Sequence, residues 1–237
     1  MIELYKFGPA FGLRETGPFV LKTMAYMRLA DIPFSETKET DPRKAPKKKI
    51  PFIVDDGEAI GDSTFIIKHL KAKFGDPLAE GLSAQQLATG HALKVMLEER
   101  TYWAGMLYPR WVKTDHHQML ADKLFSEIPK FIRMTVFRMI VKGVVKSAHG
   151  HGIARHSEAE IYELGLDDVK AVEAQLGKKK FILGPKPAEV DATVYAFLHG
   201  MSAEVFPTPI QAYIRESKTL MDYLDRMDAL VFADSTT

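Results

Sequence analysis

The sequence predicts two domains of different fold class. The first third of the chain is expected to form an α/β unit, and the remainder an all-α region. Short apolar runs bounded by Gly, Pro and Asp, which are typical of strands, occur mainly before residue 62. Beyond the Gly75-Asp76-Pro77 turn, apolar residues recur at helical spacing and strand signals almost vanish. The 237 residues are enough for two modest domains with buried cores. We therefore expect domains over residues 1–76 and 83–237, joined by a short linker.

The α/β unit is expected to begin with a strand, a glycine-rich loop and a helix. Residues 2–7 look like a strand that ends at Gly8-Pro9. A helix should start at Pro18, because proline suits the first helical turn and apolar residues then recur at helical spacing. Residues 34–37 are a candidate second strand, followed by a basic, loop-like segment over residues 41–49.

The stretch over residues 49–63 predicts a hairpin followed directly by a helix. An apolar run follows an Ile-Pro pair and stops at the turn signal Asp55-Asp56-Gly57. Asp62 or Ser63 is then placed to cap a helix over residues 63–74. A helix N-terminus next to a pre-proline backbone is suited to a small anionic molecule. The same pattern also fits an ordinary hairpin and a capped helix.

The remainder of the chain predicts helices only. Their expected ranges are residues 83–107, 115–146, 157–176, 188–201 and 210–227.

Composition restricts the classes of function. Hydrophobic residues make up 46% of the chain and charged residues 27%, as in ordinary globular proteins. The formal net charge is +1, so we expect neither a nucleic-acid partner nor a membrane partner. The absence of cysteine excludes disulfides, thiolate metal sites and a protein thiol as nucleophile. The expected location is cytoplasmic.

The most apolar later stretch is residues 131–145. Arg133, Arg138 and Lys142 interrupt it, so it is too charged to span a bilayer. We expect it to form a buried helix.

The order of these elements resembles that of the cytosolic glutathione transferase superfamily over essentially the whole chain. Within it, Gly17-Pro18-Phe19-Val20-Leu21-Lys22 and Tyr26-Met27-Arg28 look like the branch of failed axon connections protein and metaxin, as does the run over residues 152–157. The resemblance implies a thioredoxin-like N-terminal domain followed by an all-helical glutathione-transferase domain. It also implies glutathione as co-substrate, a small apolar electrophile as second substrate, and a homodimer.

The resemblance assigns five residues to glutathione. Pro51 matches the family's cis-proline, and Ile50 before it would hold the cysteinyl part through its backbone. Asp62 and Ser63 match the acidic-serine pair that receives the γ-glutamyl end at a helix N-terminus. Lys49 stands where Gln is common, and it could pair with a glutathione carboxylate.

The resemblance leaves two candidates for the group that stabilises the glutathione thiolate. Cysteine-dependent classes have Cys-Pro-Phe where this chain has Gly17-Pro18-Phe19, so thiol catalysis is excluded. Thr16 precedes Pro18 at a spacing similar to the Ser-x-Pro of serine-type classes, although it could instead cap the helix. Tyr5 lies on the first strand, as in tyrosine-type classes, although strand tyrosines are more often packing residues.

Three other groups of residues have a possible role. His149, His151 and His156 form a histidine-rich turn without a nearby carboxylate in proper spacing, so we expect no metal site.

The aromatic stretch Tyr102, Trp103, Met106 and Tyr108 belongs either to the electrophile pocket or to the domain core. Asp191 matches a family capping-box aspartate, but Ala188 replaces the usual Ser or Thr, so one reciprocal bond should be absent.

The expected function is attack of a bound glutathione thiolate on an electrophilic carbon. The alternative is a non-catalytic binding or scaffold protein with the same fold, and a membrane-associated docking component like metaxins is a further one.

Overall fold

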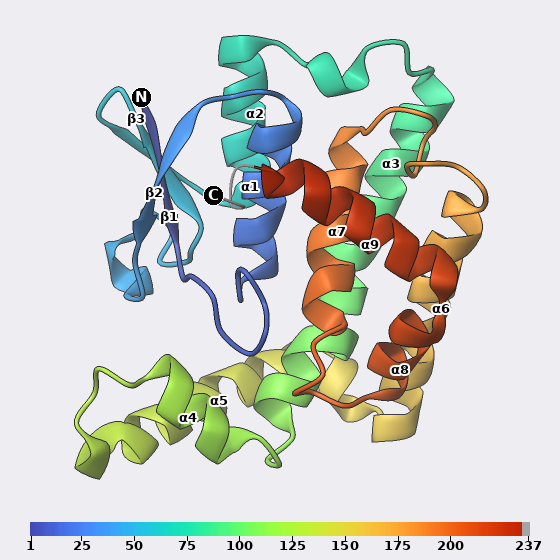
Figure 1. The fold of residues 1–237 in the computed structure, drawn as a ribbon. Helices are drawn as coiled ribbons and strands as arrows, with labels where there is room; N and C mark the ends of the chain where they lie inside the picture. Colours follow the sequence, from blue (N-terminus) through green and yellow to red (C-terminus); the bar gives the residue numbers. More distant parts are fainter. Residues whose placement is uncertain (234–237) are drawn as a thin grey trace.

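A computed structural model describes residues 1–233 (Figure 1). Four strands form one mixed sheet in the order β2-β1-β3-β4. The strands are β1 (Ile2–Lys6), β2 (Phe34–Lys38), β3 (Phe52–Asp55) and β4 (Glu58–Gly61). β1 runs parallel to β2 and antiparallel to β3, while β3 and β4 form the predicted hairpin.

Two helices, α1 (Pro18–Leu29) and α2 (Ser63–Phe74), cover one face of the sheet. Leu4 and its cross-strand partner Ile53 are fully buried on that face. Because side chains alternate along a strand, the neighbouring pair Tyr5 and Phe52 lies on the opposite face.

Every regular element after residue 76 is helical in the part of the chain described. These elements are η2 (Pro77–Ala79), α3 (Ala84–Met96), η3 (Leu97–Thr101), η4 (Trp103–Val112), α4 (His117–Leu124), α5 (Lys130–His151), η5 (Ile153–Arg155), α6 (Glu158–Leu176), α7 (Glu189–Met201), α8 (Pro209–Glu216) and α9 (Lys218–Val231). The predicted fold class, a thioredoxin-like unit followed by a helical domain, is confirmed.

Some predicted helices are longer or shorter than expected. The first long helix continues from α3 through two π-helical segments, η3 and η4, whose wider turns carry it to Val112. The helix expected over residues 115–146 is two helices, because Pro129 restricts the chain at the start of α5. Likewise Ser217 ends α8 and caps α9, its hydroxyl accepting a bond from the N–H of Leu220 at 3.1 Å.

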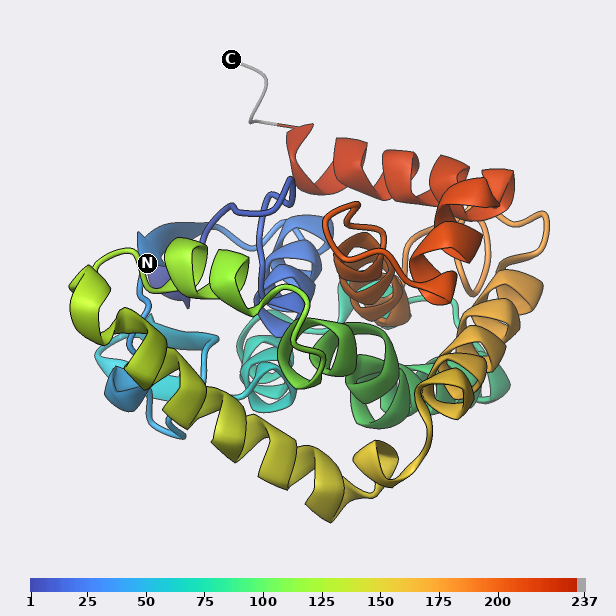
Figure 2. The same ribbon diagram turned by 90° about the horizontal axis from the view of Figure 1, so that it is seen from below.

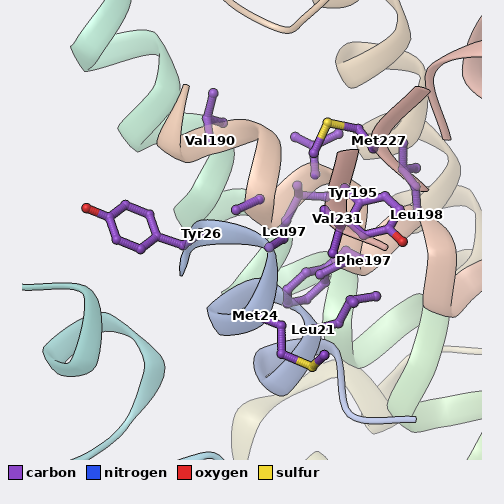
Figure 3. Packing of buried hydrophobic residues seen from close by; sticks show 14 of the residues in the cluster. Leu21, Met24, Tyr26, Leu97, Val190, Tyr195, Phe197, Leu198, Met227 and Val231 are labelled. Carbon is purple, nitrogen blue, oxygen red and sulfur yellow. The ribbon is translucent and has the colours of Figure 1, made fainter. Parts of the chain in front are cut away.

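The two parts share one core, centred on α7. Nearly all of α7 is buried, as expected of a helix that is apolar all round. Figure 3 shows Leu21 and Met24 of α1 beside Phe197 of α7. They belong to one cluster with Tyr195 and Leu198 of α7 and with residues of η3 and α9. Helix α1 of the N-terminal unit therefore packs directly on the centre of the helical domain.

Asp191 anchors the start of α7 without a hydroxyl at the N-cap. Its carboxylate accepts bonds from the N–H of Ala188 at 2.8 Å and of Ile182 at 2.9 Å. Tyr223 of α9 donates its hydroxyl to the same carboxylate at 3.0 Å, which compensates for the bond that Ala188 lacks. Complete burial raises the pKa of Asp191 to about 6. The capping role predicted for Asp191 is confirmed.

The expectation that residues 131–145 form a buried helix is wrong. They lie in α5, which runs along the outer edge of the molecule (Figure 2). Only Phe137 and Ala148 of α5 are buried, while Phe131 is 86% and Met139 68% exposed. The apolar content of the run exceeds what its single packed face can bury. Among the residues described, no helix combines the length and hydropathy needed to cross a membrane.

Candidate functional site at one end of the sheet

The strand register gathers the predicted site residues at one end of the sheet. Phe52 pairs with Tyr5 on one side and with Gly61 on the other. The residues before Phe52 and those after Gly61 therefore lie at the same end as the loop that follows β1. This end carries the Gly8–Gly17 loop, the Ile50-Pro51 peptide and the start of α2.

The Ile50-Pro51 peptide bond is cis, and both residues are buried. Lys49, directly before them, is exposed. The cis bond agrees with the family's cis-proline, and it leads directly into β3.

Asp62 and Ser63 start helix α2. Asp62 is the N-cap residue, with a φ of 80°, and its side chain accepts a bond from the N–H of Thr64 at 2.9 Å. Ser63 is buried, and its hydroxyl accepts a bond from Nζ of Lys22 at 3.2 Å. The site thus combines a helix N-terminus, a hydroxyl and an ammonium group, which together suit a carboxylate.

Lys22 is a site residue that the sequence analysis missed. It is buried inside α1 at 2% exposure and forms an ion pair with Glu98 of η3, Nζ to Oε1 at 2.6 Å. A buried lysine needs such partners, because an unpaired charge is costly in an apolar interior. The only sequence signal was a lysine in the first half of a largely apolar helix.

Glu15 is a second missed residue, and it closes the β1–α1 loop. Its carboxylate accepts a bond from the N–H of Gly8 at 2.8 Å and another from the N–H of Gly17 at 2.9 Å. Burial raises the pKa of Glu15 to about 7, although both bonds and the nearby Lys6 lower it. An acidic residue three positions before a helix that starts with Pro18 was the available signal.

Thr16 lies between these anchors. Its hydroxyl donates to the carbonyl oxygen of Gly8 at 3.4 Å, and its N–H donates to the same oxygen at 3.3 Å. The N-cap residue of α1 is Gly17, and no side chain caps this helix. The alternative in which Thr16 caps the helix is therefore wrong, and its role as thiolate donor stays a prediction.

Gly17 leaves no room for a side chain. A Cβ atom on this residue would lie 2.8 Å from Cδ2 of Phe7 and 3.1 Å from Cγ2 of Val20. Phe7 and Val20 therefore leave space at this position for glycine alone.

Arg110 of η4 reaches the same loop from the helical domain. Nη1 donates to the carbonyl oxygen of Thr16 at 3.1 Å, and Nη2 donates to that of Gly200 at 2.8 Å. Its guanidinium also stacks over the ring of Phe206, 5.0 Å from the centroid. Burial lowers the pKa of Arg110 to about 10, so the side chain remains a cation at neutral pH. The Arg110 guanidinium thus joins the carbonyl oxygen of Thr16, in the loop before α1, to that of Gly200 at the end of α7.

Tyr5 has the contacts of a packing residue. Its ring stacks on Phe52 with centroids 4.1 Å apart, and its hydroxyl donates to Oε2 of Glu3 at 3.0 Å. The bond to Glu3 raises the pKa of Tyr5, with burial and the Glu3 charge as further causes. A thiolate role for Tyr5 also stays a prediction.

The aromatic stretch contributes mainly to the core. Met106 is buried, Tyr108 meets Tyr162, and Trp103 stacks on His151 with centroids 4.4 Å apart. Tyr102 also packs on the core, with its ring 5.2 Å from Phe19 of α1 and 6.2 Å from the buried Phe197 of α7. Within residues 1–233 no group of three His, Cys, Asp or Glu side chains could hold a metal ion.

Sequence comparisons identify the family. The chain matches the family described as "Glutathione S-transferase N-terminal domain" over residues 18–116 and "Glutathione S-transferase, C-terminal domain" over residues 165–227. It is 32% identical to the "Isoprene-epoxide--glutathione S-transferase" of Rhodococcus sp. (strain AD45), over 96% of this chain and 98% of that protein. The chain belongs to the glutathione S-transferase family.

The predicted branch of the glutathione S-transferase family is confirmed as well. The chain is 30% identical to Failed axon connections of Drosophila melanogaster over 99% of its own length, and it spans 59% of that protein. Metaxins match at lower identity. A glutathione S-transferase from Methylobacterium radiotolerans, solved with glutathione sulfonate, has the same fold, with a TM-score of 0.63. It is 15% identical over 99% of this chain and 93% of that chain.

Proposed function

We propose that this glutathione S-transferase family member binds glutathione at the end of its sheet and activates the thiol for attack on a small apolar electrophile. The pairing of Ser63 with Lys22 at the N-terminus of α2 is the observation that supports the proposal most directly. Because the Ser63 oxygen accepts from Lys22, whose charge is paired with Glu98, the hydroxyl can donate its own hydrogen to the γ-glutamyl carboxylate, together with the helix N–H groups. Ile50 and Pro51 would hold the cysteinyl part through backbone bonds, and Lys49 would add attraction for a carboxylate.

The proposed reaction is substitution or addition at carbon. The name of the Rhodococcus relative supports an epoxide as one class of electrophile. A sulfur–carbon bond would form while a carbon–oxygen bond of the strained ring breaks, and the resulting alkoxide would take a proton from water. Binding both reactants at one site replaces a bimolecular encounter with an oriented one.

Ser63→Ala is expected to weaken glutathione binding by about ten- to a hundredfold, because a hydrogen bond to a charged group contributes about 1.5–3 kcal/mol. Titration calorimetry with glutathione measures the change. Thr64→Ala is the matched control, since Thr64 is the next residue of α2 and is exposed. Equal affinity of Ser63→Ala and the unaltered protein would remove the assigned γ-glutamyl site.

Thr16→Val is expected to raise the pKa of the bound glutathione thiol by about one unit, because the thiolate loses a hydroxyl donor. Ultraviolet absorbance of the thiolate, followed against pH in the complex, gives this pKa. Tyr5→Phe is the comparison and should leave it unchanged. A rise with Tyr5→Phe and none with Thr16→Val would transfer the role to Tyr5.

The non-catalytic alternative is favoured by one observation. The Thr16 hydroxyl has the carbonyl oxygen of Gly8 as its partner, and Gly17 carries no reactive group. A scaffold protein would bind glutathione without turnover of epoxides or other electrophiles, or would not bind it.

The homodimer and the cytoplasmic location also stay predictions. Sedimentation velocity measures the oligomeric state.

A further inference from the structure

Charge is strongly segregated around α5. Residues 128–157 contain no Asp or Glu, although the whole chain has 31 acidic residues and a net charge of +1. The cations of this stretch are Lys130, Arg133, Arg138, Lys142, Lys146 and Arg155. The near-neutral total, from which we expected no membrane partner, therefore hides one strongly basic segment.

The outer face of α5 combines these cations with exposed apolar side chains. Phe131 is 86%, Met139 68% and Ile132 40% exposed. At 100° per residue, Arg138, Lys142 and Lys146 fall on the same half of the helix as these three side chains. Arg133, which pairs with Asp122 at 3.0 Å, belongs to the packed side.

The opposite face of α5 holds the helix to the protein. Phe137 is fully buried against Trp111, His117 and Phe125, with ring centroids 5.8, 5.2 and 5.9 Å away. The outer face is thus fixed in orientation, and Figure 2 shows α5 along the edge of the molecule.

The match to the N-terminal family domain ends at residue 116, and the match to the C-terminal family domain begins at residue 165. Helices α4 and α5 lie entirely within this unmatched segment. The exposed face therefore belongs to a part of the chain outside both matched domains.

We propose that the outer face of α5 docks the protein on an anionic phospholipid surface. Helices that lie in a membrane interface carry cations beside bulky apolar side chains, which enter the boundary between headgroups and acyl chains. Phe131, Ile132 and Met139 are the inserting groups, and Arg138, Lys142 and Lys146 meet the lipid phosphates. The helix lies along the surface and does not cross it.

Charge complementarity favours this occupant over two others. A symmetric contact between two α5 helices would bring cations against cations without an intervening acid. Nucleic acid would satisfy the cations, but only Phe131 of the three exposed apolar side chains on this face is aromatic, whereas single-strand binding surfaces stack successive bases on several aromatics. An anionic bilayer satisfies both the charges and the apolar groups.

Vesicle co-sedimentation tests the proposal on the whole protein. We expect binding to vesicles of phosphatidylcholine with phosphatidylserine, far weaker binding to phosphatidylcholine alone, and weakening by added salt. Lys142→Glu with Lys146→Glu should lower the partition coefficient more than about tenfold. Phe131→Ser with Met139→Ser should lower it as well, because it removes the inserting groups.

The matched control is Lys178→Glu with Lys180→Glu, which makes the same change of charge at exposed positions outside α5. It should bind vesicles like the unaltered protein. No vesicle binding, or equal losses in the control and the α5 variants, would overturn the proposal. So would binding of a labelled oligonucleotide in place of vesicles, or a dimer that Phe131→Ser with Met139→Ser dissociates. The docking does not depend on catalysis, so its failure would leave the proposed function intact.

Discussion

Replacing Asp191 with alanine is expected to lower the free energy of unfolding by about 4 kcal/mol. The change leaves the buried N–H groups of Ile182 and Ala188 without an acceptor, and each unpaired group costs about 1–3 kcal/mol. Tyr223 keeps one acceptor, since its hydroxyl also donates to the backbone carbonyl oxygen of Asp191 at 3.2 Å. Denaturant unfolding, followed by tryptophan fluorescence, measures the loss.

Two further variants serve as comparisons, and both are expected to destabilise the protein less than Asp191→Ala. Asp222→Ala removes an exposed carboxylate of α9 that pairs with Lys218, and it should cost less than about 0.5 kcal/mol. Asp191→Asn keeps one acceptor oxygen and should fall between the two. An unfolding midpoint of Asp191→Ala equal to that of the unaltered protein would show that the carboxylate does not hold the start of α7.

Glu15→Gln is expected to abolish a pH dependence of stability of about 3 kcal/mol. Burial raises the pKa of Glu15 from 4.5 to about 7, so the folded protein binds a proton that the unfolded chain releases. Stability is greatest below pH 4.5 for this group and falls as the pH rises through about 7, where the buried carboxyl ionises. The size follows from about 1.4 kcal/mol for each pKa unit.

The measurement compares the free energies of unfolding of Glu15→Gln and the unaltered protein between pH 4 and pH 8. Their difference should change by about 3 kcal/mol over this interval, since all other titrating groups are common to both. Glu163→Gln, on the exposed side of α6, is the matched control for the Glu-to-Gln exchange. A constant difference for Glu15→Gln would mean that the loop carboxyl titrates as it does in the unfolded chain.

Local patterns were sufficient to predict most of the fold. The Asp55-Asp56-Gly57 turn signal gave the hairpin, and Asp62 gave the cap of α2. Turn chemistry and capping act over two to four residues, so a sequence shows them directly. The register of the hairpin then brings Pro51 and Ser63 to the same end of the sheet.

The side-chain partners within the site could not be predicted in this way. Lys22 lies 41 residues from Ser63 and 76 from Glu98, and Arg110 lies 94 residues from Thr16. No local spacing reports such contacts, because they depend on how α1 packs against the helical domain. The exposure of α5 was missed for a related reason, since an apolar run indicates a helix but not whether another layer covers it.

The bond from Arg110 to the carbonyl oxygen of Thr16 restricts how this protein can be recombined with its relatives. The shape of the Gly8–Gly17 loop is set jointly, by Glu15 from within the N-terminal unit and by an arginine encoded almost a hundred residues later. A hybrid that joins residues 1–76 to the helical domain of another transferase keeps Pro51 and Ser63 but loses that arginine. Such a hybrid would inherit the groups to which we assign glutathione binding, without the full support of the neighbouring loop.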